Sequence, residues 1–140
     1  MSLAEMRATF VDSFRNSKRR KPIMDGLEKI IQKLIDQQIE AEIWVNGSFL
    51  TTKIDPLDSD ILVIVAGDFF LKCTPAQKGT IRWLNDDLRT SFLCHSHVLF
   101  THAVGHSEYE TSVWYHAYWL RQFGFNTKND PKGIAVIKTP

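Results

Sequence analysis

The sequence predicts an α/β (α+β) fold in which helices flank a small mixed β-sheet. Two segments with apolar residues at helical spacing open the chain, and short aliphatic runs then alternate with further helical patterns. This order is typical of a mixed sheet packed against helices. The 140 residues suit a single domain, residues 1–140, and the 44% hydrophobic and 24% charged residues are typical of a soluble globular chain.

Four helices are expected, at residues 3–16, 22–35, 75–90 and 108–123. The second begins at Pro22, because proline suits the first turn of a helix, and it carries a clear apolar stripe. The last is hydrophobic on nearly every side from Val113 to Trp119. Core packing is the favoured explanation for its aromatic residues, and any part of them left exposed would suit a dimer face.

Four strands are expected, at residues 41–45, 61–65, 96–101 and 134–137. The run Ile61–Val65 is aliphatic without interruption, which is typical of a strand buried on both faces. Residues 51–59 contain a proline and two aspartates, so they are expected to form a loop, and residues 129–133 are expected to form a turn.

Charge and composition exclude several classes of protein. The formal net charge of +1 gives no overall attraction for nucleic acid or for a membrane, and no apolar run is long enough to span a bilayer. The N-terminal residues do not resemble a signal peptide, and the two cysteines form no disulfide framework. A cytoplasmic location is therefore expected.

Asp58 and Asp60 stand at the entrance to the strand 61–65 and are the first candidates for a site. Residues i and i+2 of an extended chain point to the same side, so the two carboxylates can converge although their charges repel. A cation would relieve that repulsion, and Mg²⁺ prefers one or two carboxylates together with water and phosphate oxygens. Gly47 would let a ligand approach the backbone, and Ser48 could donate to a phosphate. A polar turn without a ligand explains the same residues equally well.

The stretch GSFLTTKIDPLDSDILV, residues 47–63, resembles the signature of the polymerase-beta-type nucleotidyltransferase superfamily: a Gly-Ser pair after a strand, a spacer, and Asp-x-Asp on the next strand. Three segments are also similar to a family of small uncharacterised prokaryotic proteins in that superfamily: residues 17–30, 41–63 and 129–137. The resemblance implies a minimal nucleotidyltransferase fold. It also implies that Asp58 and Asp60 hold the metal, while Gly47 and Ser48 bind the nucleotide.

Active members of the superfamily carry a third carboxylate on a later strand, where it helps to hold the metal and can act as a base. The corresponding strand here, Cys94–His102, contains no aspartate or glutamate. By placement His97 occupies the expected catalytic position, with His95 as the less favoured choice, and the two share one face of the strand. An imidazole can act as a base near pH 7 or bind Mn²⁺ or Zn²⁺, but it is a poor ligand for Mg²⁺.

The run Lys18–Lys21 is the strongest charge cluster in the chain. Such a run is usually a solvated corner between helices. Arg19 and Arg20 fall in a segment that the family resemblance covers, however, and one or both could bind the triphosphate. Lys53, between the Gly-Ser pair and the aspartates, is better placed for a phosphate contact. Asp55 lies in the same loop and is assigned to turn chemistry.

Two hypotheses of function follow from these residues. The first is a Mg²⁺- or Mn²⁺-dependent enzyme that moves a nucleoside monophosphate from a nucleoside triphosphate to a hydroxyl acceptor on a protein, an RNA end or a small molecule. By analogy of fold, it would belong to a toxin–antitoxin or phage-defence pair. The second is a catalytically impaired protein that binds nucleotide as an antitoxin or regulatory subunit. Either would act with a protein partner or a second copy, and nucleic-acid binding through the basic run is the least favoured alternative.

Overall fold

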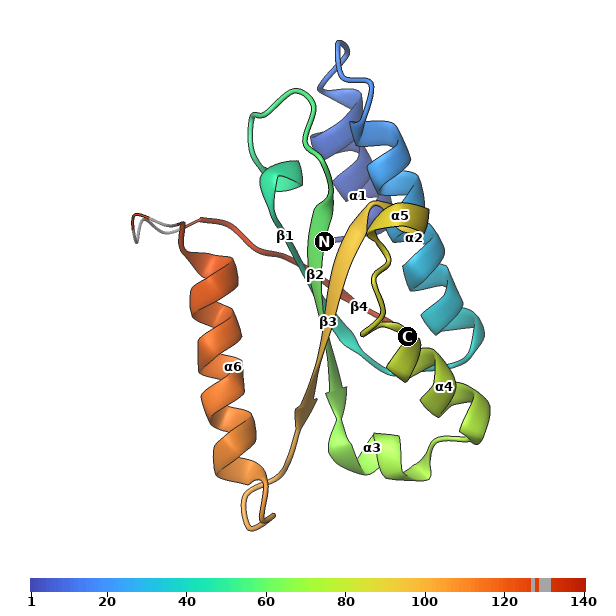
Figure 1. Cartoon of the computed structure of the whole chain (residues 1–140), viewed down its shortest axis with the longest axis vertical. Helices are drawn as coiled ribbons and strands as arrows, with labels where there is room; N and C mark the ends of the chain where they lie inside the picture. Colours follow the sequence, from blue (N-terminus) through green and yellow to red (C-terminus); the bar gives the residue numbers. More distant parts are fainter. Residues whose placement is uncertain (127, 129–131) are drawn as a thin grey trace.

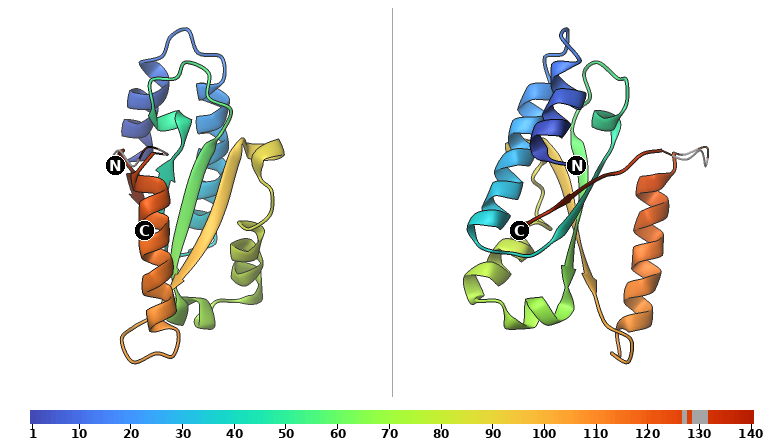
Figure 2. Two further views of the ribbon diagram at one scale, coloured as in Figure 1. Left: turned by 60° about the vertical axis from the view of Figure 1, so that its left-hand side comes forward. Right: turned by 180° about the vertical axis from the view of Figure 1, so that it is seen from behind.

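The computed structural model describes residues 1–126, 128 and 132–140. Over these residues the chain forms a four-stranded mixed sheet with six α-helices, which confirms the α+β class. Figures 1 and 2 show how the helices divide between the two faces of the sheet. One face carries α1 (Leu3–Arg7), α2 (Arg20–Asp36) and α4 (Pro75–Trp83), and the other carries α6 (Tyr109–Gly124).

The first helix is shorter than predicted, and the second is longer. Ser2 caps α1: its hydroxyl accepts from the N–H of Glu5, and the Glu5 carboxylate accepts from the N–H of Ser2. The helix continues as a π-helical turn, Ala8–Asp12, and ends before the predicted limit at residue 16. α2 begins at Arg20, ahead of Pro22, because the missing N–H of proline falls in the first turn, where no partner within the helix exists.

The four strands lie close to their predicted positions: β1 (Glu42–Asn46), β2 (Ser59–Ala66), β3 (Cys94–Thr101) and β4 (Ala135–Lys138). Their order across the sheet is β3-β2-β1-β4. β2 and β3 are parallel, whereas β1 is antiparallel to both β2 and β4. The starts of β2 and β3 and the end of β1 therefore meet at one end of the sheet.

β2 is buried on both faces, as its uninterrupted apolar run predicts. Ile61, Val63 and Val65 point into the main core, to which α2 contributes most of the helical side chains. Leu62 points to the opposite face, because successive residues of a strand alternate. It joins a smaller core with Trp44, Leu99 and Phe123.

The prediction of one helix over residues 75–90 is wrong in its second half. After α4 the chain turns through Asn85-Asp86-Asp87, residues of low helix propensity, and then forms a separate short helix, α5 (Arg89–Phe92). Leu84 and Leu88 are both buried, so their helical spacing concealed the break. The sequence also did not predict α3 (Gly67–Lys72), which follows β2 directly.

Core packing does not explain three of the four Trp and Tyr residues in the run Val113–Trp119 of α6, which corrects the prediction made for that run. Ser112 and Phe123 are its buried residues, whereas Trp114 is 62% exposed. Tyr115 and Tyr118 are 46% and 42% exposed. No other described helix lies on this face of the sheet (Figure 1), so one stripe of α6 meets the strands and the remainder faces outward.

No helix within the described part of the chain is both long and apolar enough to cross a membrane. The turn predicted at residues 129–133 falls mostly on residues 129–131, which lie outside the described residues.

Candidate functional site

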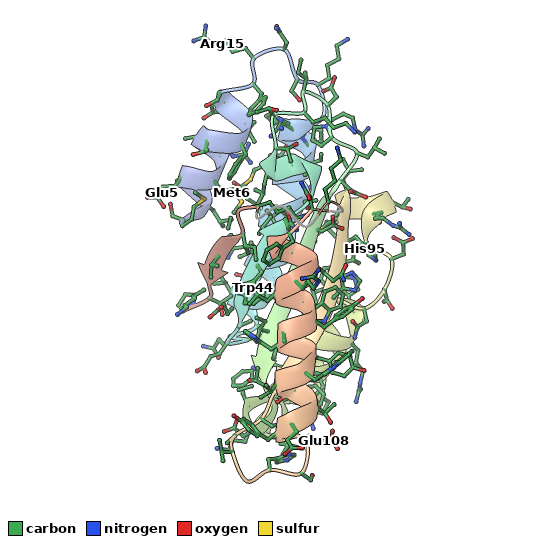
Figure 3. All side chains as sticks on the ribbon, turned by 90° about the vertical axis from the view of Figure 1, so that its left-hand side faces the viewer. Glu5, Met6, Arg15, Trp44, His95 and Glu108 are labelled. Atoms are coloured by element: carbon green, nitrogen blue, oxygen red, sulfur yellow. The ribbon has the colours of Figure 1, made fainter. Side chains whose placement is uncertain are left out.

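The predicted site residues lie where β1 ends and β2 and β3 begin. Asp60, the second residue of β2, pairs in register with Asn46 of β1 and with His95 of β3. Gly47 follows β1 directly, and Asp58 precedes β2. Figure 3 looks onto α6 and shows His95 beside the C-terminal end of this helix. The topology thus brings three distant segments of the sequence to one place.

The space beside the Gly47 backbone is taken up by the Asp60 carboxylate. The φ of Gly47 is +96°, in the region that favours glycine. A Cβ at this position would stand 2.7 Å from Oδ2 of Asp60, well inside van der Waals contact. Residue 47 therefore forms one wall around this carboxylate, and a side chain would not fit there.

The Asp60 carboxylate lies in an environment that opposes its ionisation. Burial raises the pKa of Asp60, and the charge of Asp58 raises it further. Positive charge from His95, Lys132 and Arg89 acts in the opposite direction without cancelling the shift. The two aspartates thus concentrate negative charge at the entrance to β2, which is the electrostatic condition for a cation site.

His95 lies beside Asp60, whereas the sequence favoured His97 for the catalytic position, and the catalytic role of either imidazole stays a prediction. Nδ1 of His95 is 3.7 Å from Oδ1 of Asp60. His97 instead pairs in register with Leu62, and its ring lies 4.3 Å from that of His95 and 4.5 Å from that of Trp119. Burial, together with the charge of His95, lowers the pKa of His97 and favours its neutral form. The two imidazoles share one face of β3, as predicted.

Two basic residues outside the motif lie near enough for their charges to act on Asp60. Arg89, on α5, has Asp87 as its main partner, with 3.0 Å between Nε and Oδ1, and it also senses both aspartates of the site. Lys132 precedes β4. No pattern in the sequence marks Arg89, because the fold alone brings α5 to this end of the sheet. Both residues could meet a phosphate.

Arg20 holds the loop at residues 48–58 in place, which corrects its predicted role in nucleotide binding. It is 1% exposed, and its ζ carbon lies 3.6 Å from the centre of the Phe14 ring. Its guanidinium donates at 2.5–3.1 Å to the backbone carbonyl oxygens of Phe10, Phe49, Thr51 and Lys53. A buried side chain that is bonded in this way cannot also reach a ligand.

Arg19 and Asp55 fasten the same loop to the corner before α2. The Arg19 guanidinium donates to two loop carbonyl oxygens, those of Pro56 and Leu57. The Asp55 carboxylate accepts hydrogen bonds from residues 17–19, and these bonds, led by that from the N–H of Lys18, lower the pKa of Asp55. Asp55 therefore serves the turn, as predicted, while Arg19 binds the loop where a nucleotide contact was predicted.

Ser48 and Lys53 retain their predicted roles in nucleotide binding as predictions. Ser48 begins a short 3-10 helix, η2 (Ser48–Leu50), directly after Gly47, and its side chain lies outside the described part of the structure. Lys53 is exposed, while its carbonyl oxygen accepts from Arg20. The loop that carries Lys53 is thus anchored through its backbone.

The donors at this site fit a hard divalent cation that takes some of its ligands from substrate and water. No three His, Cys, Asp or Glu side chains among the described residues are grouped to hold a metal by themselves. Mg²⁺ does not need such a group, because one or two carboxylates suffice when phosphate oxygens and water complete its shell. Burial is the main cause of the raised pKa of Asp60 and the charge of Asp58 the second, and a cation would offset both. The imidazole of His95 suits Mn²⁺ better than Mg²⁺.

Replacement of Gly47 by alanine is expected to cost more stability than the same change at Gly105. The two glycines have φ of +96° and +94°, so both alanines carry a backbone strain of about 1 kcal/mol. A Cβ at Gly105 meets nothing within 4 Å, whereas a Cβ at Gly47 meets Asp60. Urea unfolding should show Gly47→Ala to be roughly 1–2 kcal/mol worse than Gly105→Ala. Equal losses would mean that the contact with Asp60 does not constrain this position.

Comparison with known proteins gives one match. Residues 1–138 match a family described as a family of unknown function (DUF6932), so the match includes every residue of the site. No curated protein and no solved structure matches the chain.

Proposed function

The chain belongs to the family of unknown function DUF6932, and we propose that it is a metal-dependent nucleotidyltransferase of the polymerase-beta type. The observation that carries the proposal is the Asp58–Asp60 pair at the entrance to β2, where burial and then the charge of Asp58 raise the pKa of Asp60. The backbone of Gly47 closes against the Asp60 carboxylate, and His95 lies 3.7 Å from it. Paired carboxylates beside a glycine turn are the parts that metal-assisted phosphoryl chemistry requires.

Each group has a defined part in the proposed reaction. Asp58 and Asp60 would hold a Mg²⁺ or Mn²⁺ ion, which when bound would neutralise charge on the phosphate oxygens of a nucleoside triphosphate. The acceptor hydroxyl attacks the α-phosphorus in line, the bond from that phosphorus to the bridging oxygen breaks, and pyrophosphate leaves. His95 accepts the proton of the hydroxyl. Arg89 and Lys132 stabilise negative charge on the departing phosphates.

The product is a nucleoside monophosphate joined to the acceptor oxygen in a phosphodiester. The acceptor hydroxyl belongs to a protein side chain, an RNA end or a small molecule. The analogy of fold favours a toxin–antitoxin or phage-defence pair, in which a partner protein would present the acceptor.

Pyrophosphate release tests the proposal. We expect the chain, given each of the four nucleoside triphosphates with Mn²⁺ or Mg²⁺ and mixed acceptors, to release pyrophosphate only when metal is present. The double variant Asp58→Ala/Asp60→Ala should lower the rate at least about 100-fold, because it removes both metal ligands. Asp68→Ala is the matched control, since this exposed carboxylate lies in α3, after the opposite end of β2. Release that survives the double variant would contradict the proposal.

A catalytically impaired nucleotide-binding protein is the second candidate. Its specific support is that an imidazole, His95, lies beside Asp60 where active relatives by resemblance carry a carboxylate. This candidate would bind nucleotide and metal with a measurable dissociation constant but release no pyrophosphate with any acceptor. The substitution His95→Asp then separates the two candidates. It should create or raise activity in an impaired protein, whereas it should lower activity in an enzyme that uses the imidazole as its base.

A further inference from the structure

α6 presents an apolar stripe to solvent on the side away from the sheet, and Figure 3 looks onto this side. The side toward the strands carries Ser112, His116, Trp119 and Phe123, which are buried or half-buried. By helical geometry, the residues on the opposite side of the helix are likewise spaced three or four positions apart. We call this side the α6 outer face, and all five of its residues are exposed: Glu110, Trp114, Ala117, Tyr118 and Arg121.

The α6 outer face, together with the side chains that flank it, exposes a broad apolar surface. Trp114 and Tyr118 stack with their ring centres 5.7 Å apart, and Trp114 is 62% exposed. Three flanking side chains are 45–48% exposed: Val113, Tyr115 and Leu120. With about 150–250 Å² available to each aromatic side chain, the five apolar side chains offer roughly 500 Å². That area is more than half of the about 800 Å² that each partner buries in a standard interface.

The charges of the α6 outer face are arranged for pairing with a second copy. Glu110 lies in the first turn of the helix and Arg121 in the last turn, and no Asp, Glu, Lys or Arg stands between them. An antiparallel copy would place Glu110 opposite Arg121 at both ends of the contact, whereas a parallel copy would place like charges together. Antiparallel helix dipoles favour the same orientation.

The same alignment also matches a large side chain with a small one. The midpoint between Glu110 and Arg121 is also the midpoint between Trp114 and Ala117. Aligning the charges therefore sets each Trp114 against Ala117 of the second copy, where the small side chain leaves room for the indole. We propose that the chain forms a twofold symmetric dimer in which two α6 helices pack antiparallel through this face.

Sedimentation equilibrium of the full chain tests the dimer. We expect a mass of twice 16.1 kDa that dissociates on dilution. Trp114→Lys should weaken the dimer at least about thirtyfold, because a central tryptophan is replaced by a charge. Leu71→Lys is the matched control: Leu71 is 72% exposed on α3, and its replacement should leave the dissociation constant unchanged. A monomer at all concentrations, or a dimer unaffected by Trp114→Lys, would overturn the proposal.

Charge reversal tests the antiparallel orientation separately from folding. Glu110→Arg alone and Arg121→Glu alone should each weaken the dimer about tenfold, because each sets like charges together at both ends. The double reversal Glu110→Arg/Arg121→Glu restores opposite charges only in an antiparallel pair, so it should return the dissociation constant to within about threefold of the wild type. A double variant as weak as the single variants would overturn the antiparallel dimer.

Discussion

Arg20→Ala is expected to lower the free energy of unfolding by about 3–5 kcal/mol, a large part of the stability of an ordinary domain. The guanidinium is buried and makes five hydrogen bonds to four backbone carbonyl oxygens, and a charged donor makes each bond stronger than a neutral one. Alanine would leave these oxygens without their donor and open a cavity against Phe14. Urea unfolding followed by tryptophan fluorescence measures the loss.

Two further substitutions make the Arg20 result specific. Lys21→Ala removes a neighbouring positive charge that is 73% exposed and pairs with Asp25 across one helical turn, so it should change stability by less than about 0.5 kcal/mol. Arg20→Lys keeps the charge, but an ammonium has three donors and cannot reproduce the planar fork. Arg20→Lys should therefore recover less than half of the stability that Arg20→Ala loses. A loss below about 1 kcal/mol for Arg20→Ala would contradict the role assigned to this side chain.

Asp60→Asn is expected to raise stability while it abolishes the proposed activity. Ionised Asp60 is half-buried next to Asp58, so a neutral side chain of the same shape relieves unfavourable electrostatic energy. With more than a third of the side chain exposed, the gain at pH 7 should stay below about 1 kcal/mol. Asp25→Asn is the matched control and should lower stability. A hydrogen bond from Arg7 lowers the pKa of Asp25, and the substitution removes the charge that strengthens this bond.

The pH dependence of stability also distinguishes Asp60 from Asp25. A carboxyl whose pKa is raised by folding binds its proton more tightly in the native state, so Asp60 stabilises the fold at low pH. That contribution disappears as the pH rises from the ordinary value of 3.8 through the raised pKa of Asp60. Asp25 behaves in the opposite sense, since its contribution is present above 3.8 and is lost as the pH falls through the lowered pKa. The difference between wild type and Asp60→Asn should therefore grow with pH in this window and then become constant.

Local patterns predicted the strands and the aspartate pair. The run Ile61–Val65 specifies a strand that is buried on both sides, and the alternation of a strand is enough to place Asp58 and Asp60 at its entrance. Gly47 follows β1 directly and has a positive φ, while its role in nucleotide binding stays a prediction. Each of these features depends on residues that are close together in the sequence.

Features that depend on the tertiary arrangement could not be predicted in the same way. The choice between His95 and His97 depends on the register of β2 and β3, which sets Asp60 opposite His95. Arg20 stands in a run of charged residues that resembles a solvated corner, yet its carbonyl partners come from the N-terminal segment and from the loop after β1. The exposure of Trp114 depends on how many helices share its face of the sheet.

Binding of Mn²⁺, followed by electron paramagnetic resonance, tests the proposed metal site most directly. In the presence of a non-hydrolysable nucleoside triphosphate analogue, each wild-type chain should bind one Mn²⁺ ion. Binding is seen as loss of the signal of the free hydrated ion. The same titration with Asp58→Asn/Asp60→Asn should show no bound Mn²⁺ beyond that of the nucleotide alone, while Asp68→Ala, in α3 after the opposite end of β2, should bind as the wild type does. Equal binding by the wild type and the double variant would contradict the assignment of Asp58 and Asp60 as the metal ligands.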